Sequence, residues 1–400
     1  MRPHTWPLLL ALPMLFALAS GAWAASPEGG NVWAWGHNGY GQLGDGTNEL
    51  TNLAIQVGEL SEVTAISGGL AHSLALKADG TVWAWGNNGY GQLGDDSTTD
   101  SANPVRVVGL EGVIAIAAGL EHSVALASDG TVWAWGSNRF GQLGIDTADN
   151  SSTPILVPGV SRMSSIAAGG YRNLARRADG SVWTWGTPGL EGMTLDPTAM
   201  RPVPEQLPAP SGVMDVGVGI DHGMLLRDGQ VLSWGLNRYG QLGDGSKDDQ
   251  PDKLVEVKSQ RGVLKDVTAI AAGSYHGLAL TSTGTVWSWG WNGAGQLGNY
   301  STADSNLAVQ VRNLKAVRAI SAGWYHSVAL TEDGAVWSWG DNLFGKLGDG
   351  GFKQSIVPRR ASSISAVTAV SAGSDHTLAI KAPPTPTPTP RPSSIRRVRQ

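Results

Sequence analysis

The chain of 400 residues contains no cysteine. This absence excludes a disulfide framework, a thiolate metal site and a cysteine nucleophile. Charged residues are also scarce, at 15% of the chain, whereas glycine occurs 55 times and tryptophan 17 times. A composition rich in glycine and tryptophan suits short strands joined by tight turns and fits helices poorly. We therefore expect an all-β protein.

Basic residues are too few in the central part of the chain to form a face that binds nucleic acid. Residues 1–24 and 383–400 hold five arginines and no acid, which leaves 23 basic and 33 acidic residues between them. A net charge of about −10 has the wrong sign for a phosphate backbone, which requires a basic surface. Nucleic acid is therefore not expected as a partner.

The N-terminal segment is typical of an export signal. Arg2 precedes the apolar run 7–18, and Ala22-Trp23-Ala24 has the small residues of a cleavage site. The run is too short to span a bilayer as a stable helix, and no other stretch is long or apolar enough. We expect residues 1–24 to be removed and the protein to be secreted, periplasmic or at the cell surface.

Two motifs recur along the rest of the chain at spacings of about 50 residues. The first, V-W-[AST]-W-G with one V-L-S-W-G variant, begins at Val32, Val82, Val132, Val182, Val231, Val286 and Val336. The second, G-x-x-H-x-[LVM]-x-L, has its histidine at His72, His122, His222, His276, His326 and His376, with Arg172 in the third slot. Seven in-register copies of each motif identify a repeat protein.

Each repeat contains four short strands. V-W-A-W-G alternates, so Trp33 and Trp35 point to one side of their strand, as Trp83 and Trp85 do in the next copy. Apolar residues on both sides indicate that both faces are covered, and we expect the tryptophans to lie between stacked sheets. Four antiparallel strands in each unit of about 50 residues describe a propeller blade.

The two ends of the repeat region complement each other. The first copy, at residues 32–36, lacks the strand that precedes V-W-A-W-G elsewhere, and residues 376–381 supply that strand after the last copy. The sequence predicts a seven-bladed β-propeller of four-stranded antiparallel blades over residues 25–382, closed by pairing of its terminal strands. Residues 383–400 are expected to be a Pro/Thr-rich spacer and a disordered basic tail.

The tandem pattern G-x-x-H-[ST]-[LV]-A-L…D-G-x-V-W-x-W-G-x-N-x-x-G-Q-L-G resembles the regulator of chromosome condensation repeat over about residues 30–381. The resemblance also implies a seven-bladed propeller. Eukaryotic members of that family exchange guanine nucleotide on the Ran GTPase, and secreted bacterial members with shorter repeats inhibit β-lactamases through one rim. Because an export signal is expected, the chain is similar to the secreted bacterial members in its expected compartment.

The repeated polar residues are expected to be structural. Equivalent positions in a seven-bladed ring are rotated by about 51° and do not converge on one metal ion away from the axis. We expect the imidazoles to bond to the backbone of a neighbouring strand or turn, at His72, His122, His276, His326 and His376. The G-x-G-x-x-G stretch at residues 39–44 opens no helix, so we interpret its glycines as turn residues that approach a neighbouring strand closely. No metal, cofactor or catalytic residue is expected.

Positions that vary inside the strict repeat are the candidates for function. Two residues between the glycine and histidine slots change from copy to copy, which suggests solvent exposure on one rim. The partner-binding candidates there and in the histidine slot are Tyr171, Arg172, Tyr275, Trp324 and Tyr325. A second slot carries aromatic residues at 40, 90, 140, 239 and 344, which suit blade packing and partner contact equally well. The Lys- and Asp-rich insertion at residues 246–265 is expected to be a solvated loop.

These observations favour a non-enzymatic, secreted, protein-binding scaffold that uses variable rim loops, because repetition leaves no unique acid, base or nucleophile. The alternatives are a module that binds carbohydrate or the cell wall, with a cell-surface glycan stacked on aromatic side chains, and a guanine-nucleotide-exchange activity as in the eukaryotic relatives. A hydrolase built on the irregular fourth copy, around Arg172 or Asp196, is a further class.

Overall fold

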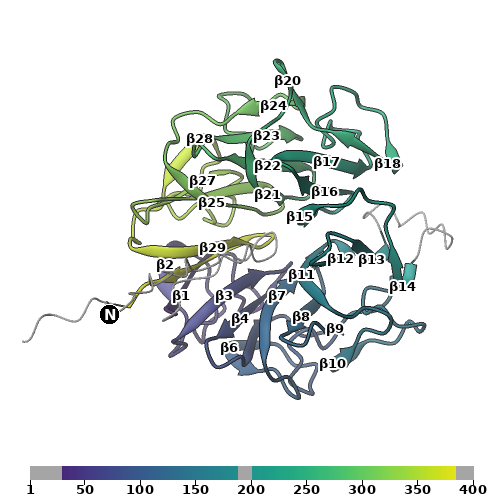
Figure 1. Cartoon of the computed structure of the whole chain (residues 1–400). Helices are drawn as coiled ribbons and strands as arrows, with labels where there is room; N and C mark the ends of the chain where they lie inside the picture. The colour runs from purple at the N-terminus through teal and green to yellow at the C-terminus, as the bar shows by residue number, and fades with distance from the viewer. Residues whose placement is uncertain (1–28, 188–200, 384–400) are drawn as a thin grey trace, which may run out of the picture.

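The computed structural model describes residues 29–187 and 201–383, and every regular element in these two ranges is a β-strand. No helix that could cross a membrane is found within them. Seven antiparallel sheets follow one another around a central axis (Figure 1). The predicted seven-bladed propeller is confirmed.

The blades are numbered here in chain order, beginning with the first that is built from consecutive strands. Blade 1 consists of β3 (Val63–Gly68), β4 (His72–Lys77), β5 (Val82–Gly86) and β6 (Ser101–Arg106). Blade 2 consists of β7 (Val113–Ala118), β8 (His122–Ala127), β9 (Val132–Gly136) and β10 (Ser151–Leu156). Blade 3 consists of β11 (Met163–Gly169), β12 (Tyr171–Arg177), β13 (Val182–Thr187) and β14 (Arg201–Gln206).

The second half of the chain repeats this order. Blade 4 consists of β15 (Val213–Val218), β16 (His222–Arg227), β17 (Gln230–Gly235) and β18 (Gln250–Glu256). Blade 5 consists of β21 (Val267–Ala272), β22 (His276–Thr281), β23 (Val286–Gly290) and β24 (Ser305–Gln310). Blade 6 consists of β25 (Val317–Ala322), β26 (His326–Thr331), β27 (Val336–Gly340) and β28 (Ser355–Arg360).

Blade 7 joins the two ends of the propeller. It consists of β29 (Val367–Ala372), β30 (His376–Lys381), β1 (Asn31–Gly36) and β2 (Thr51–Gln56). β1 and β30 pair antiparallel along their whole length, from Asn31 opposite Lys381 to Gly36 opposite His376. Figure 1 shows the purple and yellow segments side by side at this point. The predicted closure is confirmed, and it removes the two free sheet edges that an open array would leave.

Two faces of the propeller follow from the strand order. Because the strands of a blade run antiparallel, the loop after its first strand and the loop after its third strand emerge at the same end. We call these the inner loop, which contains G-x-x-H, and the outer loop, which contains G-Q-L-G. The end where both emerge is the loop face, and the end with the hairpin turns between second and third strands is the hairpin face.

The core lies at the seams between blades. Each seam holds one cluster of buried apolar side chains, and seven clusters are found. The second tryptophan of each V-W-x-W-G copy reaches across its seam. Trp135 of blade 2, for example, packs with Leu74, Val82 and Leu93 of blade 1. Trp35 and Trp85 are fully buried in the same way, whereas Trp33 and Trp83 are only half-buried.

The insertion expected as a solvated loop is partly ordered, so that expectation is wrong. Residues 246–265 contain β18, the fourth strand of blade 4, and the short hairpin of β19 (Lys258–Ser259) and β20 (Gly262–Val263). β19 pairs in parallel with β24 of blade 5, Ser259 lying opposite Ala308. The insertion adds a small contact between two blades because the free edge of β24 accepts another strand. The expected export signal at 1–24 lies outside the described residues, as does the tail from residue 384.

Candidate interaction surface

A buried asparagine holds together the outer loop of several blades. In blade 7, Asn38 Nδ2 donates to the carbonyl oxygens of Thr47 (3.0 Å) and Glu49 (3.1 Å), and Asn38 Oδ1 accepts from the amide of Leu43 (2.9 Å). The same arrangement recurs at Asn88, Asn292 and Asn342. These asparagines fix the loops that form the rim. Sequence reasoning assigned them no role, although their regular place two residues after W-G was a usable signal.

The glycines of the outer loops allow close contact with the next blade. Gly41 has a positive φ of 78°, and a Cβ atom there would lie 2.5 Å from Cα of Ala102 in β6. Gly44 also has a positive φ, and its Cβ atom would lie 2.8 Å from the ring of Trp85. Such positions favour glycine on both counts. The interpretation of these glycines as turn residues that approach a neighbour is confirmed.

Aromatic side chains of the loop face meet in pairs across the seams. Phe140 of blade 2 contacts Tyr171 of blade 3 with ring centroids 4.6 Å apart, and Tyr239 of blade 4 contacts Tyr275 of blade 5 at 5.4 Å. Further pairs are Trp291 with Tyr325 at 4.9 Å and Phe344 with His37 at 4.6 Å. The rings therefore serve blade packing while staying partly exposed, and Tyr40 and Tyr90 are more than 40% exposed.

Arginines lie beside these rings. The guanidinium carbon of Arg139 lies 5.4 Å from the centroid of Phe140, and that of Arg238 lies 5.6 Å from Tyr239. Both arginines are exposed. A surface that combines partly exposed aromatic rings with arginines has the composition found at the centres of protein interfaces.

The inner loops do not present both variable residues to solvent, so the expectation of exposure is wrong for one of them. Leu120, Ile220, Ser274 and Ser374, which stand two residues before the histidine slot, are buried. The inner loops converge on the axis and hydrogen-bond to one another; the amide of Leu120, for instance, donates to Gly170 O at 3.0 Å. The residue directly before the histidine slot stays half-exposed at Tyr171, Tyr275 and Tyr325.

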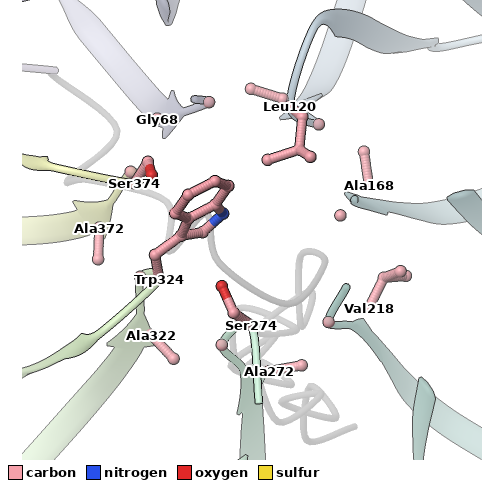
Figure 2. Close-up of a pocket in the computed structure, with 18 of the residues that line it drawn as sticks. Gly68, Leu120, Ala168, Val218, Ala272, Ser274, Ala322, Trp324, Ala372 and Ser374 are labelled. Atoms are coloured by element: carbon pink, nitrogen blue, oxygen red, sulfur yellow. The ribbon is translucent and has the colours of Figure 1, made fainter. Parts of the chain in front are cut away.

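Trp324 occupies the axis. It stands in a slot that is buried in five of the other six blades, and its indole extends across a pocket of about 100 Å³ where the seven blades meet (Figure 2). Figure 2 shows Leu120, Ala168 and Val218 on the side that the ring points toward. Its ring also contacts Tyr325 at 5.9 Å. Ligand pockets usually measure roughly 300–1,000 Å³. The axial pocket is therefore small for an organic ligand, and the surface around it is the larger feature.

A buried lysine replaces the outer-loop glutamine in blade 6. Lys346 is completely buried, and its Nζ pairs with Asp375 of blade 7 and, at 2.5 Å, with Asp341 Oδ2. Both carboxylates are partly exposed. In blades 7 and 1 the equivalent glutamines bond to His37 and Asn87. The sequence motif gave no warning of this ion-pair cluster, since Asp375 lies in the inner loop of blade 7 whereas Lys346 and Asp341 share the outer loop of blade 6.

The repeated histidines form hydrogen bonds that run around the ring. His72 Nε2 lies 3.1 Å from Ser123 Oγ of the next blade, and His122 Nε2 lies 2.8 Å from Asn173 Oδ1. His276, His326 and His376 contact the hydroxyls of Ser327, Thr377 and Ser73 in the same way. The expected partner was the backbone, but the imidazole partner in each of these contacts is a side chain. In five blades the residue after the histidine slot is polar, points into the seam and reaches the imidazole of the preceding blade, whereas blades 4 and 5 have Gly223 and Gly277 there.

The tautomer of these histidines follows from their partners. Ser123 Oγ donates to the carbonyl oxygen of Gln92 at 2.9 Å, so it accepts from His72 Nε2. Burial lowers the pKa of His72, His276 and His376 to about 3 and that of His122 to about 4. The imidazoles are thus neutral at physiological pH and donate through Nε2. Among the described residues, no group of three or more acids and histidines is arranged to hold a metal ion.

Arg172 lies apart from the aromatic candidates. Its side chain is buried, with 8% exposed, on the seam between blades 3 and 4. Asp196, named with it for a hydrolase, lies outside the described residues. The structure therefore brings Trp324 and Tyr325 together at the axis, leaves Tyr171 and Tyr275 at separate seams of the same face, and places Arg172 beneath that face.

Comparison with known proteins identifies the repeat. The profile of the RCC1-like domain matches residues 16–264 and, in a second register, residues 108–384. RCC1 domain-containing protein 1 of Mus musculus is 39% identical over 87 residues, which are 21% of this chain and 22% of that protein. The Ultraviolet-B receptor UVR8 of Arabidopsis thaliana is 37% identical over 116 residues, 28% of this chain and 26% of the receptor. The alignments thus span about a quarter or less of these relatives.

Solved structures match over nearly the whole chain. Prp20p from Saccharomyces cerevisiae superposes with a TM-score of 0.77 at 25% identity, covering 90% of this chain and 94% of Prp20p. Human WBSCR16 superposes with a TM-score of 0.76 at 23% identity, covering 88% of this chain and 99% of that protein. The second likeness shows a shared fold alone.

Proposed function

The chain belongs to the RCC1-like domain family, and we propose that it is a non-enzymatic scaffold that binds a protein partner through the loop face of its propeller. The observation that carries the proposal is the set of aromatic pairs and adjacent arginines on that one face. Prp20p binds Gsp1p and histones, so a protein of this fold that binds other proteins is already known.

The chemistry of the repeated histidines supports a binding role over a catalytic one. A general base must reach the substrate and have a pKa near the working pH. The six histidines of the motif are buried, and burial lowers the pKa of each. They therefore act in the framework of the ring, and the loop face offers recognition groups.

Replacing the loop-face aromatics should weaken partner binding. In the variant Tyr171→Ala, Tyr275→Ala, Trp324→Ala and Tyr325→Ala, we expect the affinity for a captured partner to fall at least tenfold, since aromatic anchors contribute about 2 kcal/mol or more each. The measurement is quantitative capture from culture supernatant, followed by calorimetric titration of the purified partner.

The matched control lies on the other side of the molecule. Val108, Ile114 and Met214 are exposed apolar residues at the start of, or just before, the innermost strands of blades 2 and 4, toward the hairpin face. The variant Val108→Ser, Ile114→Ser and Met214→Ser should bind the partner as the wild type does. Loss of binding in this variant alone would move the site to the hairpin face. Binding of purified peptidoglycan or another glycan through the loop face, with no protein captured, would replace the proposal by the carbohydrate-binding alternative.

We further propose that the protein is a secreted bacterial member of the family, with residues 1–24 as its export signal, a propeller over 25–382 and a spacer and tail over 383–400. Expressed in a bacterial host, the chain should appear outside the cytoplasm with Ala25 as its first residue, which intact-mass measurement checks. Ala24→Lys should leave the precursor uncut, because signal peptidase requires a small residue there. Full-length wild-type protein in the cytoplasm would refute this proposal.

A further inference from the structure

A larger cavity lies on the seam between blades 3 and 4. Its volume is about 360 Å³, within the range of roughly 300–1,000 Å³ that ligand pockets occupy. It is lined by Arg172 and Arg201 of blade 3, by Leu225 and Trp234 of blade 4, and by Leu207 in the connection between the blades. None of these residues belongs to the aromatic pairs of the loop face.

The cavity coincides with a change in the repeat. At the other seams the second tryptophan donates its Nε1–H to a carbonyl of the preceding outer loop, as Trp185 does to Gln142 O at 3.1 Å and Trp289 to Gln241 O at 2.9 Å. The outer loop of blade 3 has no G-Q-L-G. Among the described residues Trp234 has no such acceptor, and its ring forms part of the cavity wall.

Arg172 is unusual in this setting because it takes the place of a neutral histidine. The residue opposite it is Gly223, in the position where every blade except 4 and 5 carries a hydroxyl or amide. No hydrogen bond joins the Arg172 guanidinium to another described residue. Burial lowers the pKa of Arg172 to about 10, with Arg201 acting in the same direction and Asp221 opposing it. Arg172 is therefore a desolvated cation at neutral pH.

The remaining charges leave room for an anion. Arg201 donates to Glu205 Oε2 at 3.0 Å, but both side chains are partly exposed and such a pair is weak. Asp252 and Lys253 stand at the cavity as exposed residues of opposite sign. A buried guanidinium is stabilised when a carboxylate replaces its lost water, and its planar donors suit a carboxylate well. The wall of Leu207, Leu225 and Trp234 suits an apolar group.

We propose that this interblade cavity binds an amphipathic carboxylate, whose carboxylate group pairs with Arg172 and whose apolar portion packs against Trp234 and Leu225. The acid is either a free small molecule or the C-terminal carboxylate of a peptide that ends in a large apolar residue. The cavity is separate from the loop-face surface. Binding of an acid in the cavity is therefore tested independently of protein binding at the loop face.

The test is calorimetric titration of the purified full chain with 4-phenylbutyrate and with its uncharged counterpart 4-phenyl-1-butanol. We expect one molecule of the acid to bind and the alcohol to bind at least tenfold more weakly. Arg172→Gln should weaken binding of the acid at least tenfold, and Arg172→Lys should weaken it less. Arg177→Gln, a matched control on the same strand, should change it less than twofold.

The source of the carboxylate is distinguished by a pentapeptide ending in Phe, used with a free C-terminus and as the amide. Tighter binding of the free-acid peptide than of phenylbutyrate indicates a peptide ligand, and the reverse indicates a small acid. If Arg172→Gln does not fold, Arg201→Gln at the more exposed wall should weaken binding at least threefold. Equal binding of acid and alcohol, no binding of either acid at 5 mM, or unchanged binding in the folded arginine variants would overturn the proposal.

Discussion

Between pH 7 and pH 5 the propeller is expected to lose most of its stability. Six histidines are buried in the seams, and burial lowers the pKa of every one, to about 3 or 4 where a value is given. An unfolded histidine has a pKa of about 6.5. Below pH 6.5 the unfolded chain therefore binds protons that the folded ring does not.

The sign and size follow from this difference in proton binding. Stability rises with pH wherever the unfolded state holds more protons, so it is complete above about pH 6.5 and is lost progressively down to about pH 3, the lowest folded pKa given for these histidines. Each histidine contributes about 2 kcal/mol of loss between pH 7 and pH 5. Six of them add to a loss on the order of 10 kcal/mol, comparable with the usual 5–15 kcal/mol of a folded protein.

Urea unfolding at half-unit steps of pH, followed by tryptophan fluorescence, measures this loss. His222 offers a matched comparison, because neither of its ring nitrogens has a hydrogen-bond partner among the described residues. His222→Leu should keep the fold at pH 7 and reduce the slope of stability against pH by about one-sixth. A flat profile between pH 7 and pH 5 in the wild type would show that the histidines are not buried as neutral donors.

Removing β30 is the second change with a large expected effect. A chain that stops after Asp375 loses the partner of both β1 and β29 in blade 7. Leu378 and Ile380 leave one seam cluster and Ala379 the next, so two seams lose core residues. Burial of a large aliphatic side chain contributes about 1.5–3 kcal/mol, and two new strand edges would be exposed as well. We expect no cooperative unfolding transition in this variant.

A chain that stops after Pro383 is the control, because every described strand pairing is then retained. It should unfold at the same temperature as the full chain, measured by calorimetry and near-ultraviolet circular dichroism. A cooperative transition in the shorter variant, close to the wild-type temperature, would contradict the view that the ring depends on its closing strand.

The period of the motifs was enough to predict the fold. The second tryptophan of V-W-x-W-G recurs in all seven copies and the histidine of G-x-x-H in six, and a unit of about 50 residues with four alternating segments closes in only a few ways. The missing strand before Val32 and the extra one at the C-terminal end then specified the pairing. Local sequence patterns suffice here because each blade packs against two blades of the same pattern. A correct strand assignment for one blade therefore predicts the strands of all seven.

The surface was predicted less well because it depends on contacts between copies. Variation at Leu120 and Ile220 suggested exposure, yet the convergence of seven loops at the axis buries both. Arg172 looked like a rim residue by analogy with its neighbour Tyr171, but its side chain lies in a seam whose opposite wall carries Gly223. Lys346 of blade 6 meets Asp375 of blade 7 only after the two blades assemble. None of these contacts has a counterpart in a single repeat.

The hydrogen bonds between blades are not distributed evenly, and this has a mechanical consequence. The seams of blade 4 lack the histidine bond on both sides, because Arg172 faces Gly223 and His222 faces Gly277. The seam with blade 5 still has the bond from Trp289, whereas the seam with blade 3 has none of this kind among the described residues. Under a pulling force applied across the ring, the seam between blades 3 and 4 should open first. The seven blades would then form an open arc with blades 3 and 4 at its two ends.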